Sequence, residues 1–210
     1  MANFITEKSV EQYLYDLLPR RDAVLTEMED RAKREHIPII KPVVGRFLEL
    51  LVQISGARRI FEMGSAIGYS TIWLARAAGP RGEVHYTDID PERIRLAKEY
   101  IRRAGVARRV RMHEGDAAKS LAATKGTFDM IFCDADKTGY PAALKLAVPK
   151  LKRGGLLITD NVLWGGEVAA KTSDPDGLAI QKFNRQLYST KVLYPVILPL
   201  RDGVAICRKR

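Results

Sequence analysis

The spacing of hydrophobic residues along the chain changes near residue 57. Before it, apolar residues recur at helical spacing in three stretches, at about 10–18, 22–35 and 42–54. After it, short apolar runs alternate with helical stretches, which predicts a parallel sheet covered by helices on both faces. The predicted strands lie at about 59–63, 84–88, 109–113, 128–133 and 155–159, and the predicted helices at about 69–78, 91–104, 116–123, 138–151 and 175–188.

The chain closes with two further predicted strands, at about 192–198 and 203–208. They are joined through Arg201-Asp202-Gly203, a turn sequence that predicts an antiparallel hairpin at one edge of the sheet. The predicted fold class is therefore α/β: a doubly wound, Rossmann-like, mostly parallel seven-stranded sheet with one antiparallel strand, preceded by N-terminal helices. We expect one domain over residues 1–210, with 1–56 as a helical preface and 57–210 as the core. Three roles remain open for the preface: core cover, a lid over a ligand, or a dimer surface.

Composition narrows the class of protein. The hydrophobic content of 46% and the charged content of 29% are typical of a soluble globular protein. No apolar run approaches the roughly 20 residues of a membrane span, and residues 1–12 lack a signal-peptide core, so we expect a cytoplasmic protein without membrane contact. Cys133 and Cys207 each lie in a predicted strand, which favours reduced, buried thiols over a disulfide.

The net charge of +10 fits either a polyanion partner or a basic soluble protein. Its placement is more informative, because many of the basic residues come just before strands and so lie at the far end of the sheet from a ligand site. Fewer are expected near the mouth of the site: Lys137, Lys171 and Arg201, with Arg20, Arg21 and Lys41 from the helical preface.

A strand-to-helix turn bracketed by Gly64 and Gly68 is the strongest ligand signal. Such a turn aims free backbone N–H groups and the positive end of a helix dipole at a ligand beyond the first strand. The spacing departs from the G-x-G-x-x-G of dinucleotide sites, and Glu62 would repel a pyrophosphate but attract an ammonium group. Asp88 ends the next strand, where it can accept from both ribose hydroxyls. An amino acid joined to ribose and adenine is S-adenosylmethionine; the alternative is a glycine turn without a ligand.

Acidic residues follow the ends of five predicted strands, and parallel strand ends share one edge of a sheet. These residues are Glu62, Asp88, Asp116, Asp134 and Asp160. Asp134, Asp160 and Asn161 together make an all-oxygen set that suits Mg²⁺ first, with Mn²⁺ or Ca²⁺ as alternatives. Lys137 lies three residues after Asp134, which makes it a candidate general base, with a solvated loop lysine as the alternative. The three histidines show no ligand spacing, so zinc is not expected: His36 is assigned to a helix surface, and His85 and His113 to sheet packing.

Four motifs together resemble the cation-dependent O-methyltransferases of the catechol and caffeoyl-coenzyme A type. They are Glu62-x-Gly64-x-x-x-Gly68-Tyr69-Ser70, Asp134-Ala135-Asp136-Lys137-x-x-Tyr140, Asp160-Asn161-x-x-Trp164-x-Gly166 and Asp202-Gly203-x-x-x-Cys207-Arg208. The resemblance runs from about Pro38 to the C-terminus. The N-terminal third, around residues 36–39, also resembles a bacterial branch that methylates 5-hydroxyuridine in tRNA.

The resemblance implies a role for particular residues. Lys137 is the implied base, and the implied metal ligands are Asp134, Asp160 and Asn161. Tyr140 and Trp164 are expected to form apolar walls against a flat substrate ring, with core packing as the alternative role for both. Arg201 stands where many relatives have glycine, which puts the local turn and nearby substrate contacts in question. The residues implied to hold S-adenosylmethionine are Ile40, Glu62, Gly64, Ser65, Gly68, Tyr69, Ser70, Asp88, Ile89, Asp116, Ala117 and Asp134.

Three functions are compatible with the sequence. The first is a metal- and S-adenosylmethionine-dependent O-methyltransferase acting on a small aromatic vicinal diol, and we expect it to be a homodimer. The second is the same chemistry on 5-hydroxyuridine in tRNA. The third is a non-catalytic basic nucleotide-binding module, or an oxidoreductase. We favour the small-molecule enzyme, because most of the visible positive charge is predicted at the far end of the sheet.

Overall fold

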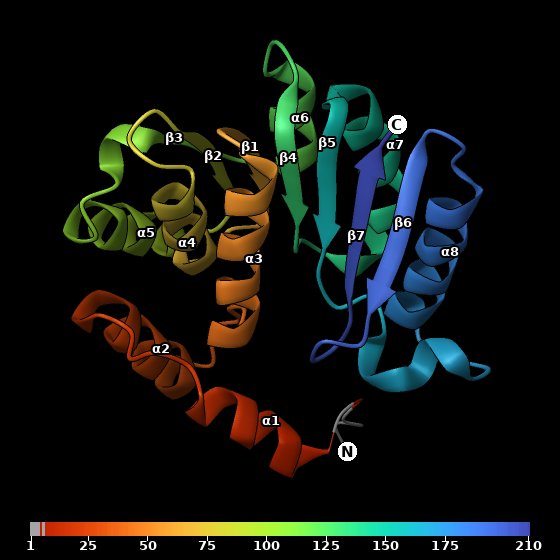
Figure 1. Cartoon of the computed structure of the whole chain (residues 1–210), viewed down its shortest axis with the longest axis horizontal. Helices are drawn as coiled ribbons and strands as arrows, with labels where there is room; N and C mark the ends of the chain where they lie inside the picture. Colours follow the sequence, from red (N-terminus) through yellow and green to blue (C-terminus); the bar gives the residue numbers. More distant parts are fainter. Residues whose placement is uncertain (1–4, 6) are drawn as a thin grey trace.

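Seven strands form one sheet in the order β3-β2-β1-β4-β5-β7-β6 in the computed structural model, which describes residue 5 and residues 7–210 (Figure 1). Only β7 runs antiparallel to its neighbours, β5 and β6. The predicted fold class is therefore confirmed, including the hairpin at one edge. The strands are β1 (Arg59–Met63), β2 (Glu83–Asp88), β3 (Val110–Glu114), β4 (Phe128–Cys133), β5 (Leu151–Thr159), β6 (Leu193–Leu198) and β7 (Val204–Lys209).

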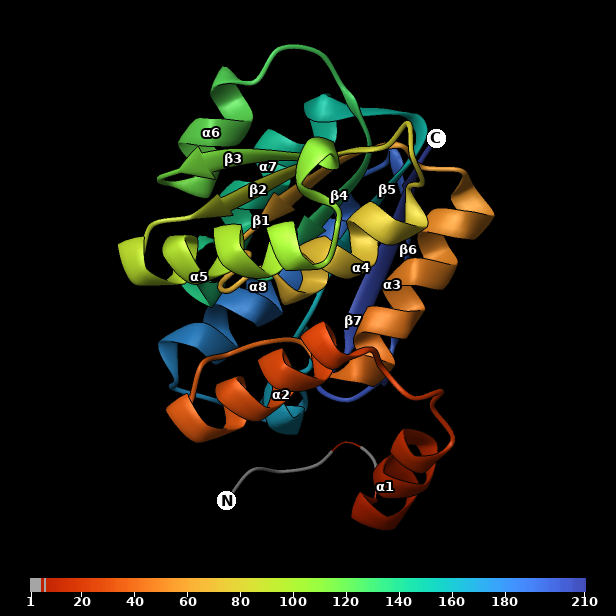
Figure 2. The same ribbon diagram turned by 90° about the vertical axis from the view of Figure 1, so that its left-hand side faces the viewer.

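Successive residues of the central strands enter two separate cores, one on each face of the sheet. Ile60 of β1 packs into the first core and Phe61 into the second. Figure 2 shows three helices over one face: α3 (Pro42–Ser55), α4 (Tyr69–Ala77) and α5 (Pro91–Arg103). The other face is covered by α6 (Ala117–Ala123), α7 (Tyr140–Lys150) and α8 (Pro175–Ser189). Because both faces are buried, the strands read as continuous apolar runs.

Strand β5 begins four residues before the predicted strand. Its first part has the sequence Leu151-Lys152-Arg153-Gly154-Gly155, which lacks the apolar run on which the prediction depended. The pairing register between β4 and β5 also shifts between Phe128 and Met130. Tertiary pairing with β4 thus extends the strand through polar and glycine residues.

The remaining helices, α1 (Lys8–Asp16) and α2 (Ala23–Glu35), differ in how they meet the body of the protein. Leu25 and Met28 of α2 are buried in the first core, whereas α1 buries none of its side chains and projects from the molecule (Figures 1 and 2). Figure 1 shows both helices near the ends toward which the β4 and β5 arrows point. In the described part of the chain, no helix is long and apolar enough to cross a membrane.

Candidate functional site

A cavity of about 990 Å³ opens at the carboxyl ends of the parallel strands. The loops after β1 to β5 supply one side, and α2 with the segment 37–42 supplies the other. Of the residues predicted to bind a cofactor, metal or substrate, three do not line the cavity: Glu62, Gly68 and Tyr140. Those that do line it are Ile40, Gly64, Ser65, Tyr69, Ser70, Asp88, Ile89, Asp116, Ala117, Asp134, Lys137, Asp160, Asn161 and Trp164.

The glycine turn is held against the ends of β2 and β4. Gly64 has φ +83°, and a Cβ built there would lie 2.7 Å from the carbonyl oxygen of Asp134, so only glycine fits this close approach. Its N–H donates to Thr87 Oγ1 at 3.1 Å, and the N–H of Ser65 donates to the Thr87 carbonyl at 2.9 Å. Gly68, at φ +84°, is the N-cap of α4. The turn is therefore fixed before any ligand binds.

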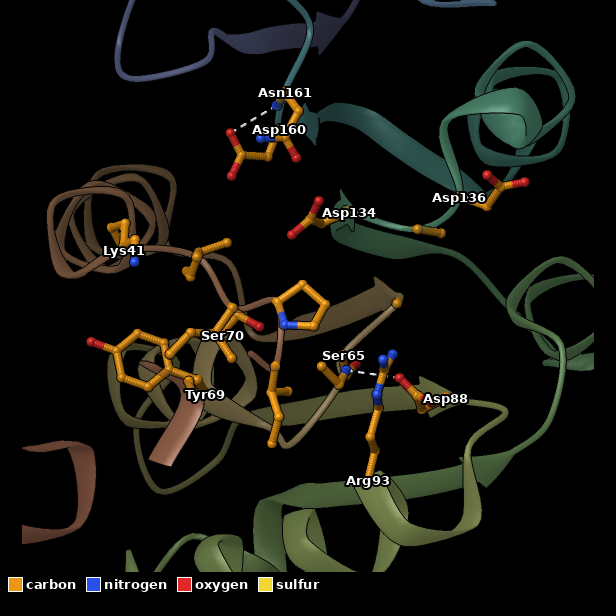
Figure 3. A pocket seen from close by; sticks show the side chains of 18 of the residues that line it. Lys41, Ser65, Tyr69, Ser70, Asp88, Arg93, Asp134, Asp136, Asp160 and Asn161 are labelled. Carbon is orange, nitrogen blue, oxygen red and sulfur yellow. Dashed lines mark hydrogen bonds between the residues drawn. The ribbon is translucent and has the colours of Figure 1, made fainter. Parts of the chain in front are cut away.

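Asp88 at the end of β2 is oriented by two backbone hydrogen bonds. Its Oδ2 accepts from the N–H of Ala66 and its Oδ1 from the N–H of Asp90, each at 2.9 Å (Figure 3). Each carboxylate oxygen has two lone pairs and therefore keeps one free. Since Asp88 lines the cavity, it can still accept hydrogen bonds from a ligand there. Asp116 is held in a similar way as the N-cap of α6, because it accepts from Lys119 N at 2.7 Å.

Glu62 lies in the wall of the cavity and not on its surface. The side chain is fully buried, and the hydroxyl of Thr71 donates to its Oε2. Burial raises the pKa of Glu62 to about 7, although the hydroxyls of Ser70, Thr71 and Ser65 oppose the shift. Oε1 has no hydrogen-bond partner among the described residues. Glu62 is thus placed to act through Ser65 and Ser70, which do line the cavity.

Asp134, Asp160 and Asn161 come together from the ends of β4 and β5, on the same side of the cavity (Figure 3). Asp160 is 5% exposed, and burial followed by the charge of Asp134 raises its pKa to about 7. Burial also raises the pKa of Asp134, against the opposing charge of Lys137. Two carboxylates that are held close together and desolvated in this way are the donors that a hard divalent cation prefers. The set fits Mg²⁺, and within the described residues no cluster of three His, Cys, Asp or Glu side chains offers an alternative site.

A chain of three hydrogen bonds fixes Lys137. Its Nζ donates to Asp134 Oδ1 at 2.7 Å and to the hydroxyl of Tyr140 at 2.9 Å, and that hydroxyl donates to the Asp160 carbonyl at 2.9 Å. The expectation that Tyr140 forms a wall against the substrate is wrong. The side chain is fully buried against Phe183, because α7 turns it into the second core, and only its hydroxyl reaches back to Lys137.

Trp164 does line the cavity, in a loop that is tied down at two points. Its backbone has φ +46°, and its indole N–H donates to Asp174 Oδ2 at 2.7 Å. The next residue, Gly165, donates its N–H to the carboxylate of Asp202 in the β6–β7 turn. The indole ring is thus a rigid apolar surface beside Asn161.

Helix α2 adds residues that the sequence did not point to. The hydroxyl of Tyr69 donates to Glu29 Oε1 at 2.8 Å, and Glu29 forms an ion pair with Arg21 at 3.0 Å. Arg21, which we expected among the basic residues near the mouth, is therefore paired with Glu29. Lys171 does not line the cavity, and Arg20 lines a separate cavity of about 190 Å³. Further lining residues that were not predicted for the site are Asp30, Lys33 and Arg93.

Comparison with known proteins agrees with this geometry. The profile of the O-methyltransferase family matches residues 20–210. A catechol O-methyltransferase of Niastella koreensis is 34% identical over 98% of each chain. An O-methyltransferase from Bacillus cereus, solved in complex with SAH, is 32% identical with a TM-score of 0.87 over 96% of this chain and 97% of that one. The O-methyltransferase TomG from Streptomyces achromogenes, involved in tomaymycin synthesis and solved with SAM, is 28% identical with a TM-score of 0.87 over 96% of each chain.

Proposed function

Since the chain belongs to the O-methyltransferase family and is an S-adenosylmethionine-dependent O-methyltransferase, we propose that its acceptor is a hydroxyl of a catechol-like vicinal diol and that a divalent cation holds this diol. The observation that carries the proposal is the placement of Asp134, Asp160 and Asn161 beside Lys137 in one cavity. The name of the Niastella relative, a catechol O-methyltransferase, supports the same acceptor class.

The methyl donor is assigned to the part of the cavity around the glycine turn. Asp88 offers free carboxylate lone pairs for ribose hydroxyls, and Asp116 and Ala117 lie beyond it at the start of α6. Ser65 and Ser70, with Glu62 beside them, suit the polar groups of the amino-acid end. Bound there, S-adenosylmethionine supplies an electrophilic methyl group on a sulfonium.

The cation is assigned to Asp134, Asp160 and Asn161, with Mg²⁺ expected and Mn²⁺ or Ca²⁺ as alternatives. When bound, it would stabilise the ionised form of an acceptor hydroxyl. Trp164 then offers an apolar face for the ring that carries the diol. Where the bound donor and acceptor displace water from this part of the cavity, charge neutralisation during transfer would be favoured.

Lys137 has the geometry of a general base. A neutral amine has two N–H donors and one lone pair, and both donors are already engaged, one with Asp134 and one with Tyr140. The lone pair is then available to accept the proton of an acceptor hydroxyl in the cavity. Tyr140 serves as a positioning residue for this amine.

The acceptor class is tested with purified protein, labelled S-adenosylmethionine and two acceptors: a 3,4-dihydroxyphenyl compound and tRNA bearing 5-hydroxyuridine. We expect transfer to the diol, its loss in excess EDTA, and its restoration by Mg²⁺ or Mn²⁺. Asp160→Asn should abolish transfer and leave binding of S-adenosylmethionine in calorimetry largely intact. Full activity in EDTA, with the metal content measured as zero, would exclude the cation, and efficient transfer to tRNA with only trace turnover of diols would replace the acceptor.

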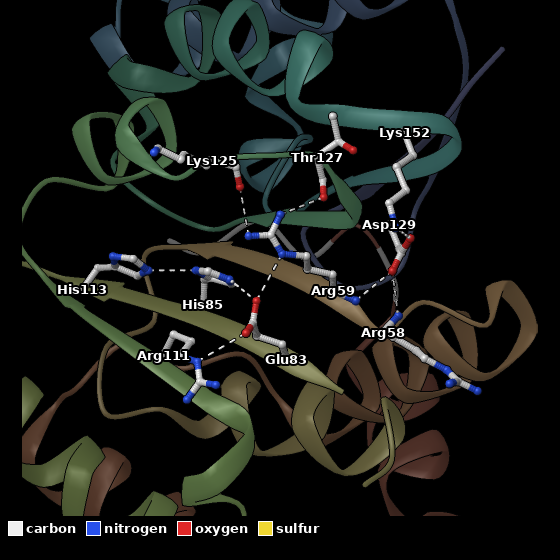
Figure 4. Close-up of polar contacts among 10 residues, drawn as sticks. All are labelled: Arg58, Arg59, Glu83, His85, Arg111, His113, Lys125, Thr127, Asp129 and Lys152. Atoms are coloured by element: carbon white, nitrogen blue, oxygen red, sulfur yellow. Dashed lines mark hydrogen bonds and ion pairs between the residues drawn. The ribbon is translucent and has the colours of Figure 1, made fainter. Parts of the chain in front are cut away.

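The distribution of charge supports the small acceptor over tRNA. Some of the basic residues at the far end of the sheet form ion pairs within the protein: Arg59 pairs with Glu83 at 3.1 Å, and Lys152 with Asp129 at 2.6 Å (Figure 4). Arg103 of α5 likewise pairs with Glu27 of α2. Side chains that are neutralised in this way are poor ligands for phosphates, which RNA binding requires in number.

A further inference from the structure

Two cations at the mouth of the cavity have no partner. Lys41, which precedes α3, and Arg201, in the turn between β6 and β7, both line the cavity. Among the described residues, neither side chain makes an ion pair or a hydrogen bond, in contrast to Arg21, Arg59 and Arg103. They are close enough to act on each other, since burial and then the charge of Arg201 lower the pKa of Lys41. Lys41 is exposed and Arg201 is half-buried, and two like charges that act on each other are unfavourable without an anion between them.

The carboxylates nearby are already used. Glu29, whose charge acts on Lys41, accepts hydrogen bonds from Arg21 and from Tyr69. Asp202 holds the N–H of Gly165, and Asp160 belongs to the proposed cation set. The exposed Asp30 of α2 also lines the cavity but forms no ion pair with Lys41 or Arg201. Within the described part of the chain, therefore, no carboxylate forms an ion pair with Lys41 or Arg201, although the charge of Glu29 acts on Lys41 and that of Asp160 on Arg201.

The backbone of Arg201 is held in a left-handed conformation that the Cβ atom of any residue other than glycine disfavours. Its φ is +52°, a left-handed value that costs an L-residue about 1–2 kcal/mol. The turn is rigid, because Gly203 N donates to the Leu200 carbonyl at 2.9 Å and Leu163 N donates to the Asp202 carbonyl at 2.9 Å. No contact of the guanidinium within the described protein accounts for this strain. Strain of this kind at a cavity points to a function for the side chain.

We propose that Lys41 and Arg201 bind an anionic group, a carboxylate or a phosphate, on the acceptor, so that the enzyme prefers acidic aromatic diols to neutral ones. The inference rests on the proposed function, which places the diol at Asp134, Asp160 and Asn161. A guanidinium and an ammonium together give an anion charge-assisted hydrogen bonds. An acceptor bound at both ends would lie along Trp164. The same pair would repel a cationic catechol amine.

An anion inside this cavity could also be the carboxylate of the methyl donor or a phosphate of RNA. The donor carboxylate is served by the polar groups around Ser65 and Ser70, on the side of the glycine turn. Binding of RNA requires several phosphate contacts, and among the described residues that line the cavity the cations without an assigned role are four: Lys33, Lys41, Arg93 and Arg201. The pair therefore fits a single anionic group on a small acceptor.

The test compares two acceptors that differ only in charge, 3-(3,4-dihydroxyphenyl)propanoate and its neutral amide, at fixed salt and saturating donor. We expect kcat/KM to favour the acid by roughly 10-fold to 100-fold, because charge-assisted hydrogen bonds are involved. Arg201→Gln and Lys41→Gln should each lower this ratio toward one, mainly through KM for the acid, and Arg201→Lys should restore part of it. Arg153→Gln removes one exposed positive charge at the far end of the sheet and should leave the ratio unchanged.

Three results would overturn the inference. One is an equal kcat/KM for the acid and the amide in the unmodified enzyme. Another is a fall in kcat/KM that is the same for both acceptors in Arg201→Gln. The third is weaker binding of S-adenosylmethionine by Arg201→Gln and Lys41→Gln in calorimetry, which would assign the pair to the donor carboxylate. If the unmodified enzyme methylates tRNA but neither diol, the proposed function itself is wrong. That outcome can be distinguished from each of the three results above.

Discussion

Lys137 is the side chain whose position is most completely specified by its neighbours. Its amine contacts a carboxylate from the end of β4 and the hydroxyl of Tyr140, which in turn is held by a carbonyl at the end of β5. The carboxylate of Asp134 and the carbonyl of Asp160 thus follow two adjacent strands, and the hydroxyl of Tyr140 comes from the first residue of α7. Because the nitrogen is held at two points, its position beside the cavity is set before the acceptor binds.

Tyr140→Phe tests this arrangement. Loss of one hydrogen bond of about 1 kcal/mol should lower kcat by about tenfold or less, because Lys137 becomes free to rotate. The affinity for S-adenosylmethionine should not change, since Tyr140 does not line the cavity. Tyr100→Phe is the matched control: Tyr100 is equally buried, its hydroxyl contacts Glu27, and it lies far from Lys137. Equal kcat for Tyr140→Phe and Tyr100→Phe in steady-state assays would contradict the positioning role.

At the scale of elements, β2 and β3 share a buried pair of histidines. His85 Nδ1 lies 2.9 Å from His113 Nε2, and the two rings stack with centroids 5.1 Å apart. His85 Nε2 lies 2.9 Å from Glu83, whose carboxylate also accepts from Arg59 and Arg111 (Figure 4). Burial lowers the pKa of both histidines, although Glu83 opposes the shift at His85. These contacts therefore assign His85 and His113 to sheet packing and not to ligand binding.

The lowered pKa values give the histidine pair a contribution to acid sensitivity with a definite sign. Between its folded and unfolded pKa values an unfolded histidine binds more protons, so the contribution of the pair to the free energy of unfolding falls as the pH drops below about 6.5. Glu62 and Asp160, whose pKa values are raised to about 7, act in the opposite sense between pH 7.5 and pH 5.5, so the histidine contribution is measured by urea unfolding as a difference between the unmodified protein and a variant without the pair. A separate loss should follow below about pH 4.5, because His85, followed by Arg59, lowers the pKa of Glu83 to about 2.

His113→Asn should remove the contribution of the histidine pair to this pH dependence. Because the Glu83 carboxylate can only accept, neutral His85 donates to it through Nε2 and accepts through Nδ1. The side-chain amide of asparagine can still donate to that Nδ1 but does not titrate. His36→Asn is the control, because His36 is exposed and its left-handed backbone at φ +54° suits asparagine. A slope between pH 7.5 and pH 5.5 that is the same in the unmodified protein and in His113→Asn would remove the histidine pair as its cause.

At the scale of the whole molecule, α1 presents an apolar side that none of the described residues covers. Tyr13 and Leu17 are each 62% exposed, and the helix buries none of its residues. The edge strand β6 adds exposed Tyr194 and Val196. An exposed apolar face and an unpaired strand edge are both features that a second copy of the chain can cover. We propose that the enzyme is a homodimer and that α1 contributes to its interface.

Size-exclusion chromatography with light scattering tests the oligomeric state. The unmodified enzyme should have twice the chain mass, and the double variant Tyr13→Glu, Leu17→Glu should shift it toward the monomer, because two charges would be buried in an apolar contact. Gln12→Glu changes the charge at an exposed polar position of the same helix and should leave the dimer intact. A monomeric mass for the unmodified enzyme at micromolar concentration would exclude the proposal.

The sequence by itself determined the sheet and the edge at which the site lies. Short apolar runs identify strands buried on both faces, and parallel strands bring their carboxyl ends to one edge, so the acids at 88, 116, 134 and 160 had to converge. The sequence also located the turn between β1 and α4, because the backbone conformation at positions 64 and 68 requires glycine. These features depend on local geometry and on chain direction, which the order of residues specifies.

Only the tertiary structure decided which side chains face the cavity and which meet across it. Tyr140 looked like a substrate contact, but the packing of α7 buries it, and Glu62 lies in the wall because α4 covers it with Thr71. Glu29 of α2 lines the cavity and accepts a hydrogen bond from Tyr69 of α4. The charge of Arg201, near the end of the chain, acts on Lys41, near its beginning. Contacts of this kind join residues that are distant in sequence, and burial and side-chain direction follow from packing, which no local pattern encodes.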